Sequence, residues 1–482
     1  MRILFAFLIN LLVNFAVGLM AAAFLGPDQF GRFAVAMGLG AAIQVLAFDW
    51  IRLAAARSYS EHHRWLRPEI RSTLDLSFLT LAFGLALAAG CVLVLAPSSI
   101  VSAELLAGAL IFAIANGHFD YQAALLRARF ADRAYGRLVL TKNVLALLLT
   151  AGVAWATGSA LATLAGACLG LAVTTLTMRF VTRDEAAGPR SARGETLRTS
   201  LAYGMPLSAS SLLYLVIPLA DRWLASRWFG FAESGQLALA QDVGLRLVMA
   251  IGTALDVLLF QFAVRAEHVE GAEGARAKIA SNMGVIFAIT LPATAGVWLV
   301  LPSFEALIVP AEFRGPFAHY LTLLLPGLFL FGLMSFALAP AFQMERRTWP
   351  VTCAAAIAVT VNAGLAFALS RGVDARVLAL AQTTALCAGF VALACFAGAA
   401  RLSGPRLVDL AGASLATAAM CGLTYPLRGL EPGVATLLLQ AGAGGILYGL
   451  LALAFDLAGL RSALRAWLER RRQSRLQRAN ET

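Results

Sequence analysis

Long apolar runs separated by short polar stretches follow one another along the whole chain. A helix that crosses the hydrocarbon core of a bilayer needs about 20 apolar residues, and it must satisfy its own backbone hydrogen bonds. The pattern therefore predicts fourteen transmembrane helices joined by short loops. They lie at residues 3–24, 33–50, 73–96, 101–122, 138–157, 160–178, 200–220, 235–262, 281–301, 317–340, 349–370, 375–398, 406–425 and 434–456.

The composition agrees with lipid as the main solvent. Of the 482 residues, 60% are apolar and 13% are charged, against about 45–50% and 25% in soluble domains. This excludes a cytosolic enzyme with a membrane anchor, and the long runs argue against a β-barrel, whose strands alternate in polarity. We expect an all-α membrane protein. The six cysteines lie in apolar stretches without a CxxC pair, which is typical of core residues.

The net charge of +11 is unevenly distributed along the chain. With the N-terminus inside, thirty Lys and Arg residues fall in inner regions and seven in outer loops, while Arg246 lies within a helix. Because cytoplasmic loops are enriched in basic residues, both termini are predicted to be cytoplasmic, and nucleic acid is not an expected partner. The basic tail 457–482 is predicted to be a helix on the anionic inner surface or a solvated segment.

Residues 24–36 and 228–240 align without gaps at an offset of 204, and both read Gly-x4-Gly-x2-Ala-x-Ala. Each copy is expected to make a tight reversal in the outer loop between the first two helices of a six-helix set, because glycine allows backbone angles that other residues avoid. The repeat indicates duplication, with the two halves related by a pseudo-two-fold axis along the membrane normal. We expect an N-lobe (1–180), a cytoplasmic linker (181–199), a C-lobe (200–400), two further helices (401–456) and the tail.

Residues 25–31 (LGPDQFG), followed by an apolar helix, resemble the start of bacterial polysaccharide flippases of the Wzx type. Residues 220–224 (ADRWL), leading to Gly230 and Gly235, are similar to the same family, which belongs to the multidrug/oligosaccharidyl-lipid/polysaccharide (MOP) superfamily. The fourteen-helix layout extends the resemblance over nearly the whole chain, although the N-terminus lacks a basic cytosolic lead. The resemblance implies lipid-linked oligosaccharide as the substrate, movement by alternating access, and a place in the bacterial inner membrane. It also implies membrane lipids, and polysaccharide polymerase and chain-length proteins, as partners.

Charged side chains inside a span normally face a cavity or a partner, because each costs about 2.5–3.5 kcal/mol at mid-bilayer. Asp242, Arg246 and Asp256 share one stripe of a predicted helix, with Arg246 roughly 16 Å from its outer end. Arginine binds two phosphate oxygens at once, so we interpret Arg246 as an anchor for a diphosphate beside carboxylates that exchange protons. An internal Asp242–Arg246 pair is the alternative.

Other polar residues could also line a substrate pathway. Asn116, Asp120 and Arg127 share a face of the fourth helix, and Asn10 and Asn14 share a face of the first, where they either line the cavity or bond a neighbouring helix. Asp49 and Arg52, which have opposite charges, end the second helix near the inner surface. The predicted pathway comprises Arg246, Asp242, Asp256, Arg52, Asp49, Asn10, Asn14, Asp120 and Arg222.

Three function classes differ in the cavity or the loops that they require. A flippase for undecaprenyl-diphosphate-linked repeat units of surface polysaccharide, such as lipopolysaccharide or exopolysaccharide, needs a wide and partly cationic cavity, which Arg246 supports. A drug exporter of the same superfamily would favour an acidic, aromatic cavity for organic cations. A membrane enzyme needs catalytic groups on a sizeable outer loop, and the longest, about 302–316, has no paired-carboxylate motif. Without a phosphate-binding loop or histidines at ligand spacing, we expect no enzyme, no cofactor and no metal site.

Overall fold

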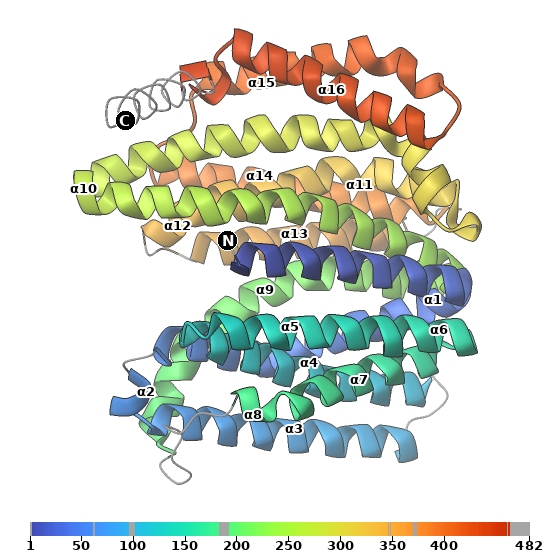
Figure 1. Cartoon of the computed structure of the whole chain (residues 1–482), viewed down its shortest axis with the longest axis vertical. Helices are drawn as coiled ribbons and strands as arrows, with labels where there is room; N and C mark the ends of the chain where they lie inside the picture. The colour runs from blue at the N-terminus through green and yellow to red at the C-terminus, as the bar shows by residue number, and fades with distance from the viewer. Residues whose placement is uncertain are drawn as a thin grey trace, which may run out of the picture. The chain divides into compact units, whose positions relative to one another are not determined.

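The computed structural model describes residues 2–60, 63–95, 102–182, 192–345, 347, 349–369, 374–459 and 461–462, and all regular structure in them is helical (Figure 1). The predicted all-α class is confirmed. The first part of the chain forms α1 (Arg2–Ser58), α2 (His63–Leu66), α3 (Glu69–Leu95), α4 (Ala103–Ala128), α5 (Asp132–Leu145), η1 (Ala146–Ala151), α6 (Gly152–Thr157), α7 (Ala160–Thr177), α8 (Arg179–Thr182) and α9 (Gly194–Trp228).

The second part begins with a helix that is folded back on itself. It comprises α10 (Phe231–Ile308), η2 (Ala311–Phe313), α11 (Pro316–Leu333), η3 (Met334–Leu338), α12 (Ala339–Met344), α13 (Trp349–Leu369), α14 (Arg376–Ala399), α15 (Leu407–Thr424), η4 (Tyr425–Gly429), α16 (Val434–Ala454) and η5 (Leu457–Gly459). The π-helical segments η1 and η3 continue the α-helices on either side of them, so that α5 to α6 and α11 to α12 each form one rod.

Two of the long helices contain a sharp turn at a glycine. Gly26 in α1 has φ 67° and Gly271 in α10 has φ 75°, values that favour glycine. Twelve described helical stretches are long and apolar enough to cross a membrane, and Asn10–Ser58 is one of them. Dividing that stretch at Gly26 and adding α4, which carries polar residues in its middle, gives the fourteen predicted spans.

The described residues fall into two compact units. The first contains those of Met1–Val243, Pro310–Tyr320 and Ala358–Gln382. One of its cores joins α1, α3 and α4, where Phe48, Phe78 and Tyr121 are buried. The ring of Phe78 lies 4.7 Å from that of Phe48 and 6.0 Å from that of Tyr121, measured between centroids. These contacts fix the helices that carry most of the polar residues considered below.

The second unit contains the described residues of Gly244–Val309, Leu321–Ile357 and Thr383–Thr482. One core packs α10 against α11 and α12 around Met283, Ile286 and Leu333. Another joins the second limb of α10 to α15 and α16 around Ala413 and Ala416. The division into two six-helix lobes remains a prediction, and most of the linker (183–191) and the tail from residue 463 lie outside the described residues.

Some predicted loop positions are wrong. Arg222 was expected in an outer loop after a helix ending at residue 220, but α9 continues to Trp228 and buries Arg222. The helix continues because the charged pair Asp221 and Arg222 finds partners within the protein rather than in solvent. At the first Gly-x4-Gly copy the predicted tight turn is present at Gly26, and Gly230 in the second copy also has a positive φ of 96°. The loop itself is shorter than predicted, since α1 resumes as a helix directly at Pro27.

Candidate functional site

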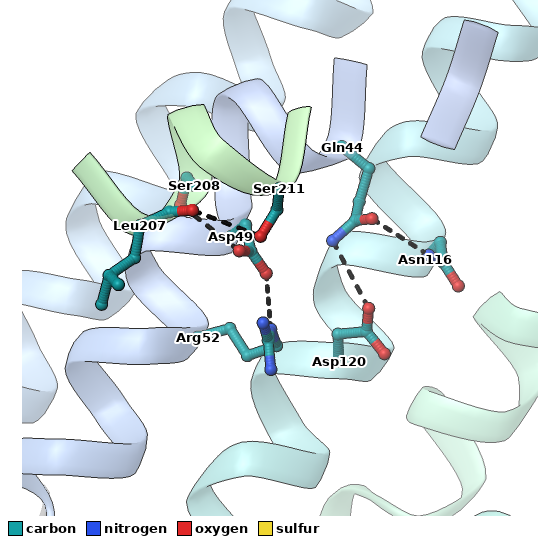
Figure 2. A network of polar contacts seen from close by, with 8 residues as sticks. All are labelled: Gln44, Asp49, Arg52, Asn116, Asp120, Leu207, Ser208 and Ser211. Carbon is teal, nitrogen blue, oxygen red and sulfur yellow. Dashed lines mark hydrogen bonds and ion pairs between the residues drawn. The ribbon is translucent and has the colours of Figure 1, made fainter. Parts of the chain in front are cut away.

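An ion pair lies inside the first unit where the second limb of α1 meets α9 (Figure 2). Arg52 Nε donates to Asp49 Oδ1 at 2.5 Å, and the hydroxyl of Ser208 donates to Asp49 Oδ2 at 3.3 Å. Asp49 is buried, whereas the side chain of Arg52 keeps 31% of its surface exposed. The carboxylate therefore fixes one edge of the guanidinium and leaves other N–H groups accessible.

A second set of amide and carboxylate groups, between α1 and α4, is drawn beside this pair (Figure 2). Asn116 Nδ2 donates to Gln44 Oε1, and Gln44 Nε2 donates to Asp120 Oδ2, both at 3.4 Å. Arg52 is close enough to Asp120 for attraction between their charges. The structure thus brings three of the predicted residues, Asp49, Arg52 and Asp120, into one network.

A lysine that the sequence did not single out joins the predicted asparagines. Asn14 Nδ2 donates to Asn10 Oδ1 at 3.0 Å, and the ammonium of Lys142 on α5 donates to Asn14 Oδ1 at 3.2 Å and to Asn10 Oδ1 at 3.4 Å. Its nitrogen also lies 5.5 Å from the centroid of the Phe119 ring. The sequence offered one signal for this residue. Lys142 is one of only two lysines in the chain, and it lies inside a predicted span, where a charged side chain is costly.

Arg222 forms a second polar cluster within the same unit. Its Nη2 donates to Asp242 Oδ1 at 2.5 Å and its Nε donates to Gln241 Oε1 at 2.7 Å. Gln241 in turn donates to Gln382 Oε1 at 2.7 Å. The alternative of an internal Asp242–Arg246 pair is therefore wrong, since the carboxylate of Asp242 is bound by an arginine from α9.

Asp221 is the most deeply buried carboxyl group of this cluster. It is fully buried, and Asn362 Nδ2 donates to its Oδ1 at 2.9 Å. Within the described part of the chain, Asp221 Oδ2 and Asn362 Oδ1 have no hydrogen-bond partner. Two buried acceptor oxygens without a donor are costly, so this pair can take up a proton or a small cation. No group of three His, Cys, Asp or Glu side chains among the described residues is placed to hold a metal ion.

Arg246 and Asp256 belong to the second unit. Arg246 is half-buried on α10, and its guanidinium has no hydrogen bond or ion pair with another described side chain. The side chain of Asp256 lies outside the described residues. The roles predicted for these two residues remain predictions.

The two Gly-x4-Gly copies contact each other inside the first unit. A Cβ atom at Gly31 would overlap the carbonyl oxygen of Phe231 and lie 2.9 Å from the amide nitrogen of Gly235. Conversely, a Cβ atom at Gly235 would overlap the carbonyl oxygen of Pro27 and lie 3.0 Å from the amide nitrogen of Gly31. Pro27 and Phe231 are separated by the repeat offset, so the contact is reciprocal, as at an interface with two-fold symmetry.

Several solved structures are similar to the chain. A lipid II flippase, MurJ, in an inward closed conformation matches with a TM-score of 0.69 and 14% identity, over 94% of this chain and 98% of that chain. An inward-facing multidrug resistance MATE family transporter of the MOP superfamily matches with 0.53 and 17%, over 82% and 94%. A MOP superfamily transporter from Pyrococcus furiosus matches with 0.51 and 18%, over 83% and 94%.

No protein-family model matches the sequence, and no curated protein matches it at a significant level. At identities below a fifth, the likeness concerns the fold. The chain is a multi-pass membrane protein with the helical fold that MurJ and the MATE transporters of the MOP superfamily share.

Proposed function

We propose that the chain is a flippase that carries undecaprenyl-diphosphate-linked oligosaccharide repeat units from the inner to the outer leaflet of the bacterial inner membrane, for the synthesis of surface polysaccharide. Its termini are then cytoplasmic, and it is a transporter rather than an enzyme. The observation that carries the proposal is the pair of cations Arg52 and Lys142, which are held by side chains of membrane-spanning helices in the first unit.

These cations suit a diphosphate head group. Ionisable residues inside spans mark substrate or ion pathways by default, because they are costly to retain. The accessible edge of the Arg52 guanidinium can bind two phosphate oxygens, while the ammonium of Lys142 acts as a point charge. The amides of Asn10, Asn14 and Asn116 offer donors and acceptors for sugar hydroxyl groups.

Fold likeness supports a lipid-linked substrate over a soluble one. The solved structure that matches this chain with a TM-score of 0.69 is that of a lipid II flippase. Movement by alternating access requires that the protein open to one side at a time, and we assign the reciprocal contact of the two glycine repeats as a point that separates during this movement. Arg246, Asp242 and Asp256 complete the proposed pathway, and polysaccharide polymerase and chain-length proteins are its proposed partners.

Export of organic cations is the second candidate, because MATE transporters share the fold. Arginine and lysine in the candidate site disfavour a cationic substrate through like-charge repulsion. Both candidates are tested on the full-length protein reconstituted in vesicles, with a fluorescent undecaprenyl-diphosphate oligosaccharide in one assay and a cationic dye in the other.

We expect translocation of the lipid-linked oligosaccharide and none of the dye. Arg52→Gln and Lys142→Gln should each slow translocation about tenfold, which corresponds to roughly 1.4 kcal/mol of lost interaction. Arg401→Gln, at an exposed position after α14, is the matched control and should behave as the unchanged protein. Transport of the dye alone would establish the exporter instead, and full activity of both variants would remove Arg52 and Lys142 from the site.

A further inference from the structure

Arg428 lies on a stack of aromatic rings at the turn between α15 and α16. Its guanidinium carbon is 3.9 Å from the centroid of the Trp298 ring, and that ring stacks on Tyr425 with 6.2 Å between centroids. A cation within about 6 Å of an aromatic face is held there by the ring quadrupole. Within the part of the chain that the structure describes, no side chain pairs with this guanidinium by hydrogen bond or opposite charge, so its N–H groups are available to an anion.

Two apolar grooves flank the second limb of α10 beside this arginine. The first, of about 340 Å³, lies between that limb and α15 and α16, and Val297, Met420 and Tyr448 line it. The second, of about 430 Å³, lies between the same limb and α11, where Trp298 and Phe329 line it. Both volumes fall in the range of about 300–1,000 Å³ that is typical of ligand sites. Trp298 therefore lines the second groove and also contacts the guanidinium of Arg428.

A buried amide adds a polar contact to the first groove. Gln440 is fully buried and lines this groove, and its Nε2 donates to the carbonyl oxygen of Leu427 at 2.8 Å, directly before Arg428 in the chain. Gln440 Oε1 has no hydrogen-bond partner among the described residues. An acceptor that is buried without a donor costs free energy, so a ligand with a hydroxyl group would be stabilised here.

We propose that this is a binding site for one anionic glycerophospholipid with a hydroxyl-bearing head group, of the phosphatidylglycerol type. Its phosphate binds Arg428, a head-group hydroxyl donates to Gln440, and its two acyl chains occupy the two grooves on either side of α10. One cation beside two grooves matches a lipid with one phosphate and two chains. Because the grooves lie along membrane-spanning helices, the bilayer itself supplies this ligand.

The test is native mass spectrometry of the full-length protein from mixed phosphatidylglycerol and phosphatidylcholine. We expect one retained phosphatidylglycerol, preferred about fivefold over phosphatidylcholine, since one basic residue near an anionic lipid has about that effect. Arg428→Gln should reduce the preference to about one. Arg401→Gln, which removes an exposed arginine elsewhere in the same unit, should leave it unchanged.

A second variant tests the contribution of the first groove to lipid binding separately from that of the charge on Arg428. A Cβ atom at Gly445, which lines the first groove, meets nothing within 4 Å, so Gly445→Leu fills the groove without a clash and should abolish retention of both lipids. Gly442→Leu, on the same helix and equally unobstructed, is the control and should bind normally. Equal retention of the two lipids, an unchanged preference in Arg428→Gln, or displacement of phosphatidylglycerol by an equimolar long-chain prenyl phosphate would overturn the proposal.

Discussion

Arg222 joins α9 to α10, a structural role that its position after a predicted span does not indicate. The guanidinium binds Asp242 and Gln241 at once, and both partners come from α10. Arg222→Gln would leave Asp242 without its cation. We expect this substitution to lower the free energy of unfolding by about 1.5–3 kcal/mol, the usual contribution of hydrogen bonds to charged groups. Thermal unfolding of the purified protein in detergent measures the effect.

Arg227→Gln is the matched control for this prediction. Arg227 lies on the same helix but is exposed, and surface substitutions usually change stability by less than about 0.5 kcal/mol. If Arg222→Gln instead kept its unfolding temperature and lost only transport, Arg222 would act in the substrate pathway, as the sequence alone suggested.

Residues that meet within one helix could be predicted from the sequence, whereas partners from other helices could not. Asp49 and Arg52 are three apart and Asn10 and Asn14 four apart, so they lie on one helix face, and the structure pairs them. Lys142 lies 128 residues beyond Asn14. No periodicity connects positions that far apart, and for the same reason the pairing of Asp242 with Arg222 on another helix was not predicted.

At the scale of elements, α1 and α10 approach each other at the two glycine repeats so closely that no residue with a side chain would fit there. Gly31→Ala would place a methyl group against the main-chain carbonyl of Phe231, and backbone atoms cannot move aside as a flexible side chain can. Forcing extra atoms into a packed contact costs about 1–3 kcal/mol. We expect a corresponding fall in unfolding temperature, and the same for Gly235→Ala because the contact is reciprocal.

Gly84→Ala provides the comparison for these two variants. Gly84 lies within α3, where an added Cβ atom meets nothing within 4 Å. Alanine favours the helix over glycine by about 1 kcal/mol, so this variant should be as stable as the unchanged protein or more so. Equal stability of all three variants would show that the repeats separate in solution.

Element by element, the apolar runs predicted the spans well and their ends poorly. A run of about 20 apolar residues has one stable solution in lipid, a helix, which explains the agreement over fourteen segments. Helix ends depend on whether polar residues find partners, which hydropathy does not report. Asp221 and Arg222 were therefore read as a loop, although α9 continues seven residues past Asp221.

For the whole molecule, the repeat offset of 204 residues says more about how the chain is organised than any single motif does. Duplicated halves that are inserted in the same direction can meet through equivalent surfaces, and Pro27 with Gly235 mirrors Phe231 with Gly31. A gapless repeat could thus predict that two segments are equivalent. That they touch could not be predicted, because equivalence in the sequence does not determine the distance between two segments in the fold.

In the alternating-access mechanism proposed above, this contact separates once in every transport cycle. The guanidinium carbon of Arg32 lies 4.4 Å from the centroid of the Phe231 ring. Cysteines at these two positions can therefore be joined by a short bis-methanethiosulfonate, which forms a disulfide with each thiol, releases a sulfinate at each, and is cleaved again by a thiol reductant. In a background without the six native cysteines, we expect the cross-linked Arg32→Cys/Phe231→Cys protein to lose flipping of the lipid-linked oligosaccharide and to regain it on reduction. Each single-cysteine variant, treated in the same way, should stay active. Continued flipping by the fully cross-linked protein would mean that the two repeats form a permanent structural contact, and that the substrate passes through the protein without their separation.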